Sequence, residues 1–198
     1  MSATGMTVAA NERAWQLPSR GRVGMICLII AESAIFMIFV VAYIFYIGKS
    51  LSGPTPREVL AVPIVGTICL LSSSPTIHWA IASLRRGQAA AFRIFWFLTL
   101  VLGAIFIGST ILEWHHLIYQ DNFTIQTNLF GTTYYCLVGL HALHVIVGLI
   151  GLALVMILAL IGRVKREHSD RCDVFSLYWH FVDAVWVVVF TTVYIVSR

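Results

Sequence analysis

Residues 139–148, GLHALHVIVG, lie inside the longest part of the chain that carries no Asp, Glu, Lys or Arg, residues 122–162. The two histidines of this stretch, His141 and His144, stand three residues apart, which places them on one face of a helix. Gly148 continues roughly the same face without a side chain, so a neighbouring helix can approach closely there. The sequence therefore predicts a long apolar helix with one face that meets other helices.

The composition is that of an integral membrane protein. Of the 198 residues, 59% are hydrophobic and 11% are charged, and the mean hydropathy is +0.87. A soluble domain carries about a quarter charged residues, and this chain has too few to cover a surface that faces water. The formal net charge of +4 does not indicate nucleic-acid binding, because the basic residues lie at the ends of apolar segments.

Five apolar segments follow a polar tail, residues 1–22, and each is close to or above the ~20 residues needed to cross the hydrocarbon core. We place them at about 23–47, 59–84, 92–114, 129–162 and 174–196. Each is expected to be helical, because unpaired backbone groups are too costly in lipid, and none alternates as a barrel strand does. The prediction is an all-α integral membrane bundle of five transmembrane helices, residues 23–198.

The distribution of Lys and Arg predicts the orientation, because these residues concentrate in cytoplasmic loops. The tail contains three, the loop after the second segment three and the loop after the fourth segment four, whereas the other side holds Lys49, Arg57 and Arg198. We therefore expect the tail and the N-terminus to be cytoplasmic and the C-terminus to be outside.

Ionisable side chains fall within the predicted helices, where they are costly and usually face the bundle interior or a watery cleft. They are Glu32, His78, Glu113, His141, His144, His180 and Asp183. Glu32 and Asp183 are each nine residues into helices that run outward. At ~1.5 Å per residue they are expected at the same depth, roughly 14 Å from the cytoplasmic side.

Glu32 has no basic partner in its own helix, and burial disfavours the charged form of a carboxyl group. Two interpretations remain open for it. One is a protonated acid that hydrogen-bonds to a neighbouring helix. The other is a group that responds to protons or contacts lipid.

The last helix gathers polar and aromatic residues around Asp183. His180 is three residues before Asp183, and Trp179 and Trp186 share its face. We expect a buried polar knot in which Asp183 accepts hydrogen bonds from both indoles beside the histidine. Proton handling and binding of a lipid headgroup are the alternatives.

Metal binding is the other chemistry that the histidines suggest. His141 or His144 together with His180 are candidate axial ligands of a haem between facing helices. However, HxxH alone is a weak signal, and no third ligand type clusters with it. We therefore expect no metal site, and histidines that bond to acids across helices.

Short motifs spread over all five predicted helices carry a family resemblance. They are residues 31–33 (AES) with Phe36; 71–74 (LSSS) with His78; 102–103 (LG) with 113–114 (EW); 131–135 (GTTYY) with 139–148; and 178–183 (YWHFVD) with Trp186. Taken together and in this order, they resemble subunit III of the haem-copper respiratory oxidases, in the short bacterial five-helix form. The resemblance covers nearly the whole chain beyond residue 22.

This resemblance implies an accessory, non-redox subunit of an oxygen-reducing, proton-translocating oxidase of aerobic electron transport in the bacterial inner membrane. Haems and copper would belong to the partner subunits. This chain would pack on subunit I, with subunit II and a small subunit IV as further partners, and would hold phospholipid in a cleft. It would support proton uptake and durability over many turnovers. Glu32 matches the family's buried carboxylate near that cleft, and His141, His144, Glu113, His180 and Asp183 match its other buried polar positions.

Several alternatives stay open from the sequence. The electron donor of the complex is cytochrome c or a quinol, with cytochrome c favoured, and relatives associated with nitric oxide reductases share this subunit type. A stand-alone proton or solute transporter that uses Glu32 and Asp183 is a different class of function. No internal repeat or pair of broken helices supports it. No nucleophile and base are paired, so we expect no catalytic centre on this chain.

Overall fold

A computed structural model describes residues 19–47, 49, 60 and 62–197, and within these residues the regular structure is entirely helical. The long helices are α1 (Arg20–Tyr46), α3 (Ile64–Arg85), α4 (Ala89–Tyr119), α5 (Leu129–Leu160) and α6 (Ser169–Phe190). Helix α6 follows a short 3₁₀ turn, η1 (Arg166–His168), and continues as a π-helical segment, η2 (Thr191–Val196). Five of these helical spans are long and apolar enough to cross a membrane, which confirms the predicted fold class.

The helices extend beyond the predicted apolar segments at several ends. Helix α1 begins at Arg20 rather than at residue 23. The Ser19 side chain caps this start by accepting a hydrogen bond from the Arg22 backbone N–H. Helix α4 runs to Tyr119 rather than 114, and α6 begins at Ser169 rather than 174. Hydropathy marks the part of a helix that crosses lipid, whereas capping groups and polar turns determine where the helix ends. Helix α3 begins at Ile64 rather than at 59, because the described residues 60, 62 and 63 are not helical. Residue 59 and residues 1–18 of the predicted tail lie outside the described residues.

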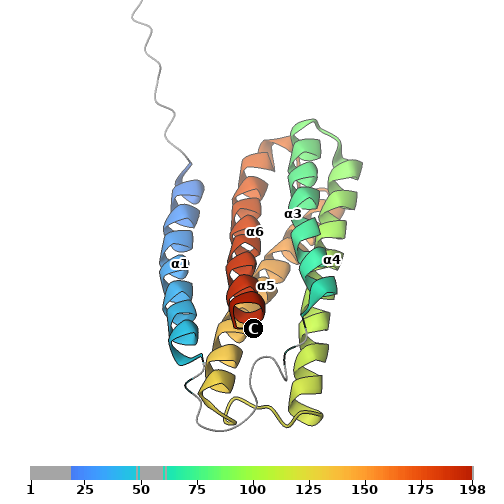
Figure 1. The fold of residues 1–198 in the computed structure, drawn as a ribbon. Helices are drawn as coiled ribbons and strands as arrows, with labels where there is room; N and C mark the ends of the chain where they lie inside the picture. Colours follow the sequence, from blue (N-terminus) through green and yellow to red (C-terminus); the bar gives the residue numbers. More distant parts are fainter. Residues whose placement is uncertain (1–18, 48, 50–59, 61, 198) are drawn as a thin grey trace, which may run out of the picture.

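Helix α6 occupies the middle of the bundle, and α1 lies at its edge (Figure 1). Helices α3 and α4 form an antiparallel pair joined by a tight turn at Gly87, whose φ of 76° suits glycine. Helix α6 packs against α1, α3 and α5, while α1 contacts only α5 and α6 extensively. Of the five spans, the one that contains α6 is the most buried and α1 is the least buried.

Glycines let the helices approach around the Trp179 indole. A Cβ atom on Gly103 of α4 would lie 2.8 Å from Trp179 Cη2, and one on Gly148 of α5 would lie 2.9 Å from Trp179 Cζ3. One turn further along α5, a Cβ atom on Gly151 would lie 2.8 Å from the Phe175 ring. The close approach predicted at Gly148 is therefore confirmed, and the approaching helix is α6.

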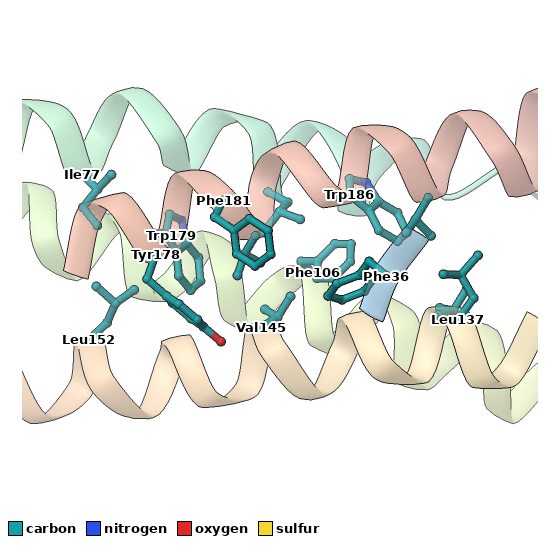
Figure 2. Close-up of a cluster of buried hydrophobic side chains, with 14 of the residues drawn as sticks. Phe36, Ile77, Phe106, Leu137, Val145, Leu152, Tyr178, Trp179, Phe181 and Trp186 are labelled. Atoms are coloured by element: carbon teal, nitrogen blue, oxygen red, sulfur yellow. The ribbon is translucent and has the colours of Figure 1, made fainter. Parts of the chain in front are cut away.

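Large buried side chains fill the space between the helices. Trp96, Trp179, Trp186, Tyr134 and Phe106 are each at most 1% exposed. Figure 2 shows how Trp179, Trp186 and Phe181 project from α6 toward the residues of the other helices. In lipid the helices gain little from the hydrophobic effect against each other, so this tight packing is what holds them together.

At one end of the bundle, a single carboxylate forms ion pairs with two arginines on different helices. Asp173 near the start of α6 binds Arg22 of α1 at 3.2 Å and Arg85 of α3 at 3.1 Å. Two of the basic residues that the sequence assigns to the cytoplasmic side therefore lie together. The contact joins α1, α3 and α6 at the same level.

Candidate functional site: buried carboxyl and imidazole groups

Glu32 of α1 contacts His144 of α5 across the edge of the bundle. Glu32 Oε2 lies 3.1 Å from His144 Nε2. His144 Nδ1 lies 2.8 Å from the carbonyl oxygen of Leu140, which only accepts hydrogen bonds, so Nδ1 carries a proton. The contact with Nε2 then holds one proton between carboxyl and imidazole, as a neutral pair or as an ion pair.

This pair is partly buried at the edge of the bundle. The side chains of Glu32 and His144 are 24% and 12% exposed. The Phe36 ring covers the imidazole with centroids 4.9 Å apart, and the Tyr178 hydroxyl donates to the His144 carbonyl at 3.0 Å. A hydrogen bond to a neighbouring helix was one of the two interpretations of Glu32, and in the structure Glu32 contacts His144 of α5.

An apolar groove of about 250 Å³ lies between two helices of the bundle. It runs between α1 and α6 and is lined by Ser33, Phe36, Met37, Val40, Phe181, Ala184, Val185, Val188 and Val189. Its walls are almost entirely hydrocarbon. A groove of this chemistry suits an acyl chain, and its one polar lining residue, Ser33, follows Glu32 in α1.

His141, one turn before His144, is fully buried and faces inward. Its ring stacks on Trp186 with centroids 5.0 Å apart and meets the edge of Phe106 at 5.7 Å. Within the described part of the chain, neither ring nitrogen has a hydrogen-bond partner. The two histidines of the GLHALHVIVG stretch therefore differ: His144 bonds to an acid, as expected, and His141 lies among aromatic rings.

Hydroxyl groups in a row on α3 form hydrogen bonds with polar side chains of α6. Trp179 Nε1 donates to Ser73 Oγ at 2.7 Å, and Trp186 Nε1 donates to Thr67 Oγ1 at 3.2 Å. His180 Nδ1 lies 2.6 Å from Ser74 Oγ. These contacts join the two helices along about two turns.

These contacts contradict the predicted arrangement around Asp183, in which both indoles would donate to its carboxyl group. Both indoles bond to hydroxyls on α3, so neither caps the carboxyl group. Among the described residues, neither carboxyl oxygen of Asp183 has a hydrogen bond of normal geometry. The Ser74 hydroxyl lies near this carboxyl group. The sequence shows which residues share a face of α6, but the partner helix determines where each indole N–H points.

The expected common depth of Glu32 and Asp183 agrees with the ion pair at the end of the bundle. Arg22 and Asp173 are in contact, and Glu32 and Asp183 each follow one of them by ten residues. Both helices run in the same direction (Figure 1), so each carboxyl lies about 15 Å along its helix from that contact. The two carboxyls have different neighbours nonetheless, His144 for one and Ser74 for the other.

Glu113 belongs to a second cluster, near the other end of the bundle. Its Oε1 accepts from Tyr194 at 2.9 Å and from Tyr134 at 3.3 Å. Tyr194 lies in the π-helical segment η2, where the wider turn changes the direction of the side chains. Sequence reasoning missed Tyr194, since a tyrosine in an apolar helix end shows no spacing signal. Tyr134 was visible only as part of the GTTYY motif.

His78 departs from the predicted buried network, because its side chain lies on the exposed surface of α3. Of the three candidate haem ligands, His144 and His180 contact side chains of other helices, and His141 is enclosed by aromatic rings. No group of three His, Cys, Asp or Glu side chains suited to a metal ion occurs in the part of the chain that the structure describes.

Comparison with known proteins places these features in a family. Residues 18–198 match the family model of cytochrome c oxidase subunit III. The cytochrome c oxidase subunit 3 of Alkalihalophilus pseudofirmus is 34% identical over 168 residues, which cover 84% of this chain and 82% of that protein. The same subunit of Thermostichus vulcanus is 30% identical over 200 residues, with 97% and 95% covered. The cytochrome bo(3) ubiquinol oxidase subunit 3 of Pseudomonas aeruginosa is 33% identical over 172 residues, with 85% and 81% covered.

Proposed function

Because the chain belongs to the cytochrome c oxidase subunit III family, we propose that it is the accessory subunit III of an oxygen-reducing, proton-pumping terminal oxidase. The chain is a multi-pass protein of the bacterial inner membrane. In this proposal it carries no catalytic centre and no redox group. It packs directly on the haem- and copper-containing subunit I, and subunits II and IV complete the complex.

The proposed electron donor of the complex is cytochrome c. The relatives from Alkalihalophilus pseudofirmus and Thermostichus vulcanus are named for cytochrome c oxidases. The relative from Pseudomonas aeruginosa, named for a ubiquinol oxidase, is nearly as similar and supports a quinol as the alternative donor. Oxygen uptake by the purified complex with reduced cytochrome c or with a quinol distinguishes the two.

The contribution of this chain centres on the contact between Glu32 and His144, and that contact is the observation that carries the proposal. A carboxyl and an imidazole that share one proton at mid-membrane can take up or release a proton with little rearrangement. The adjoining groove between α1 and α6 accommodates lipid. We infer that the pair and the groove support proton uptake by subunit I and its durability over many turnovers.

A Glu32→Gln variant tests this role in the assembled complex. Glutamine keeps the size of the side chain and a hydrogen bond to His144 but cannot exchange a proton. We expect normal assembly and nearly unchanged initial oxygen uptake, with fewer turnovers before inactivation or slower proton uptake at high pH. Cys27→Ser is the control, since Cys27 is exposed on the same helix and does not line the groove.

Two outcomes contradict parts of the proposal. Loss of the assembled complex in Glu32→Gln would show that the carboxyl group acts in structure alone. A pull-down of the unmodified chain in mild detergent, with an optical spectrum of the material that accompanies it, tests the subunit assignment itself. Haem-containing large subunits are expected, and a colourless chain that purifies alone would contradict the assignment.

A further inference from the structure

The cluster around Glu113 joins a carboxyl group to two phenols between apolar helices. Glu113 Oε1 accepts hydrogen bonds from Tyr194 at 2.9 Å and from Tyr134 at 3.3 Å. The two hydroxyl oxygens lie 3.5 Å apart, and Tyr134 and Tyr194 are 0% and 2% exposed. An ionisable group among membrane helices is costly, so its presence indicates a function. Because both phenols donate to the same oxygen, the hydroxyl proton of either has a direct route to the carboxyl group.

The two phenols belong to a longer row of indole and phenol rings. Tyr194 lies beside Trp186, with ring centroids 6.4 Å apart. Tyr134 lies beside Tyr135 at 5.2 Å, and Tyr135 lies beside Trp114 at 5.3 Å. We call these five side chains the aromatic row; it leads from the buried Trp186 to Trp114, which is partly exposed. Indole and phenol are the side-chain rings that lose one electron most readily, and an electron passes quickly between rings in contact.

Packing alone does not require this arrangement. Aromatic rings with centroids about 4.5–7 Å apart stabilise any core, and phenylalanine at positions 134 and 194 would fill the same space without a carboxyl group beside it. What the phenols gain from Glu113 is a proton acceptor at hydrogen-bond distance. A phenol that loses an electron becomes a strong acid and must release its proton, and the core of a bilayer holds no water to take it.

We propose that the aromatic row is a path for one-electron oxidation, in which Tyr194 and Tyr134 hold the radical and Glu113 holds its proton. A one-electron oxidant of the ferryl-haem class takes an electron from an indole of the row and leaves an indole radical cation. That indole regains an electron from the phenol pair, and the phenol's hydroxyl proton moves to Glu113 Oε1. The products are a neutral indole, a neutral phenoxyl radical and a protonated carboxyl group.

The inference rests on the proposed function for the source of the oxidant, which a haem-containing, oxygen-reducing partner supplies. Because the five rings are side chains, the path needs no bound redox group. In the complex, the path would draw oxidising equivalents away from side chains that oxidation destroys. This gives the proposed role in durability over many turnovers a chemical basis in the chain's own residues.

Photo-oxidation of the full chain in detergent tests the path without any partner subunit. Flash-excited ruthenium tris-bipyridine, quenched by a cobalt(III) ammine, supplies the oxidant, and electron paramagnetic resonance of frozen samples distinguishes tyrosyl from tryptophanyl radicals. The chain carries Tyr119→Phe, because Tyr119 is 72% exposed and lies outside the row. We expect a tyrosyl radical with an exchangeable proton coupling, which reports the hydrogen bond from the protonated Glu113. A chain that forms no tyrosyl radical, or one without that coupling, would overturn the inference.

Substitutions in the same chain locate the radical and its proton acceptor. The double variant Tyr134→Phe/Tyr194→Phe is expected to lose the tyrosyl signal. Glu113→Gln keeps an acceptor oxygen but cannot take a proton, so it is expected to lose the signal as well, with the radical left on tryptophan. Tyr178→Phe is the matched control and is expected to keep the signal, since Tyr178 is 8% exposed and bonds to the His144 carbonyl outside the row. A tyrosyl signal that persists in the double variant or in Glu113→Gln would contradict the proposed path.

The outcomes also separate this inference from the subunit assignment. If the unmodified chain accompanies haem-containing subunits but forms no tyrosyl radical, the assignment stands and the path is wrong. If the radical forms as described and no haem-containing subunit accompanies the chain, the path stands and the assignment fails.

Discussion

Helices α1 and α6 run in the same direction and meet at the contact between Arg22 and Asp173, yet they are held in different ways. Helix α6 is enclosed on several sides, places the Trp179 indole against two glycines and gives its donors to hydroxyls of α3. Helix α1 lies at the edge and relies on one ion pair, the contact between Glu32 and His144, and a few aromatic rings. The centre is thus tightly enclosed, whereas the edge carries a polar contact whose two side chains are partly exposed.

The largest expected effect comes from Trp179→Ala in the centre. The change leaves a cavity where a fully buried indole was and removes the hydrogen bond to Ser73. We expect a loss of about 3–5 kcal/mol in the free energy of unfolding, measured by circular dichroism during denaturation in detergent. Trp79→Ala is the control, since that indole is 52% exposed. Equal losses in the two variants would contradict the assignment of α6 as the tightly enclosed centre.

An intermediate effect is expected from Gly103→Ala. The added methyl group would lie 2.8 Å from Trp179 Cη2 and 2.9 Å from Leu149 Cδ2, so the indole or the helix must shift at a cost of about 1–3 kcal/mol. Gly108→Ala on the same helix meets nothing within 4 Å and is expected to stabilise the helix by up to about 1 kcal/mol. The same denaturation assay compares them, and a neutral Gly103→Ala would argue against close packing of α4 on α6.

The smallest effect is expected at the edge, from Arg22→Gln. The pair with Asp173 is half exposed, and Asp173 keeps Arg85 as a partner, so the loss should be at most about 1 kcal/mol. The change should appear as faster amide hydrogen exchange in α1 with little change in α6. Arg20→Gln is the control, because Arg20 forms no ion pair among the described residues. Faster exchange in α6 as well would show that edge and centre unfold together.

The sequence predicted much of this architecture for simple reasons. A spanning segment must be both apolar and helical, so the five helices and their number followed from hydropathy alone. Gly148 predicted a close helix approach, which α6 makes. The expectation that histidines bond to acids across helices holds for His144 but not for His141. Each of these conclusions depends on one helix at a time or on the properties of lipid.

Contacts between helices were predicted less well, and Asp183 shows why. Helical periodicity indicates which residues share a face of α6, but the indole N–H groups could reach either Asp183 on their own helix or hydroxyls on α3. The choice depends on the axial offset of α3, which brings Ser73 and Thr67 opposite the two indoles. His78 was wrongly expected inside for the same reason, since the sequence does not show which side of α3 meets α6.

Composition and spacing thus predicted a five-helix membrane protein with acids and histidines inside its apolar helices, because lipid restricts both backbone and side chains residue by residue. The pairing of Glu32 with His144, the isolation of His141 among rings and the reach of Tyr194 to Glu113 came only from the packed bundle. Those contacts join residues from 81 to 112 positions apart or enclose one side chain between several helices. They depend on helix rotation and offset, which are properties of the assembled structure rather than of any one segment.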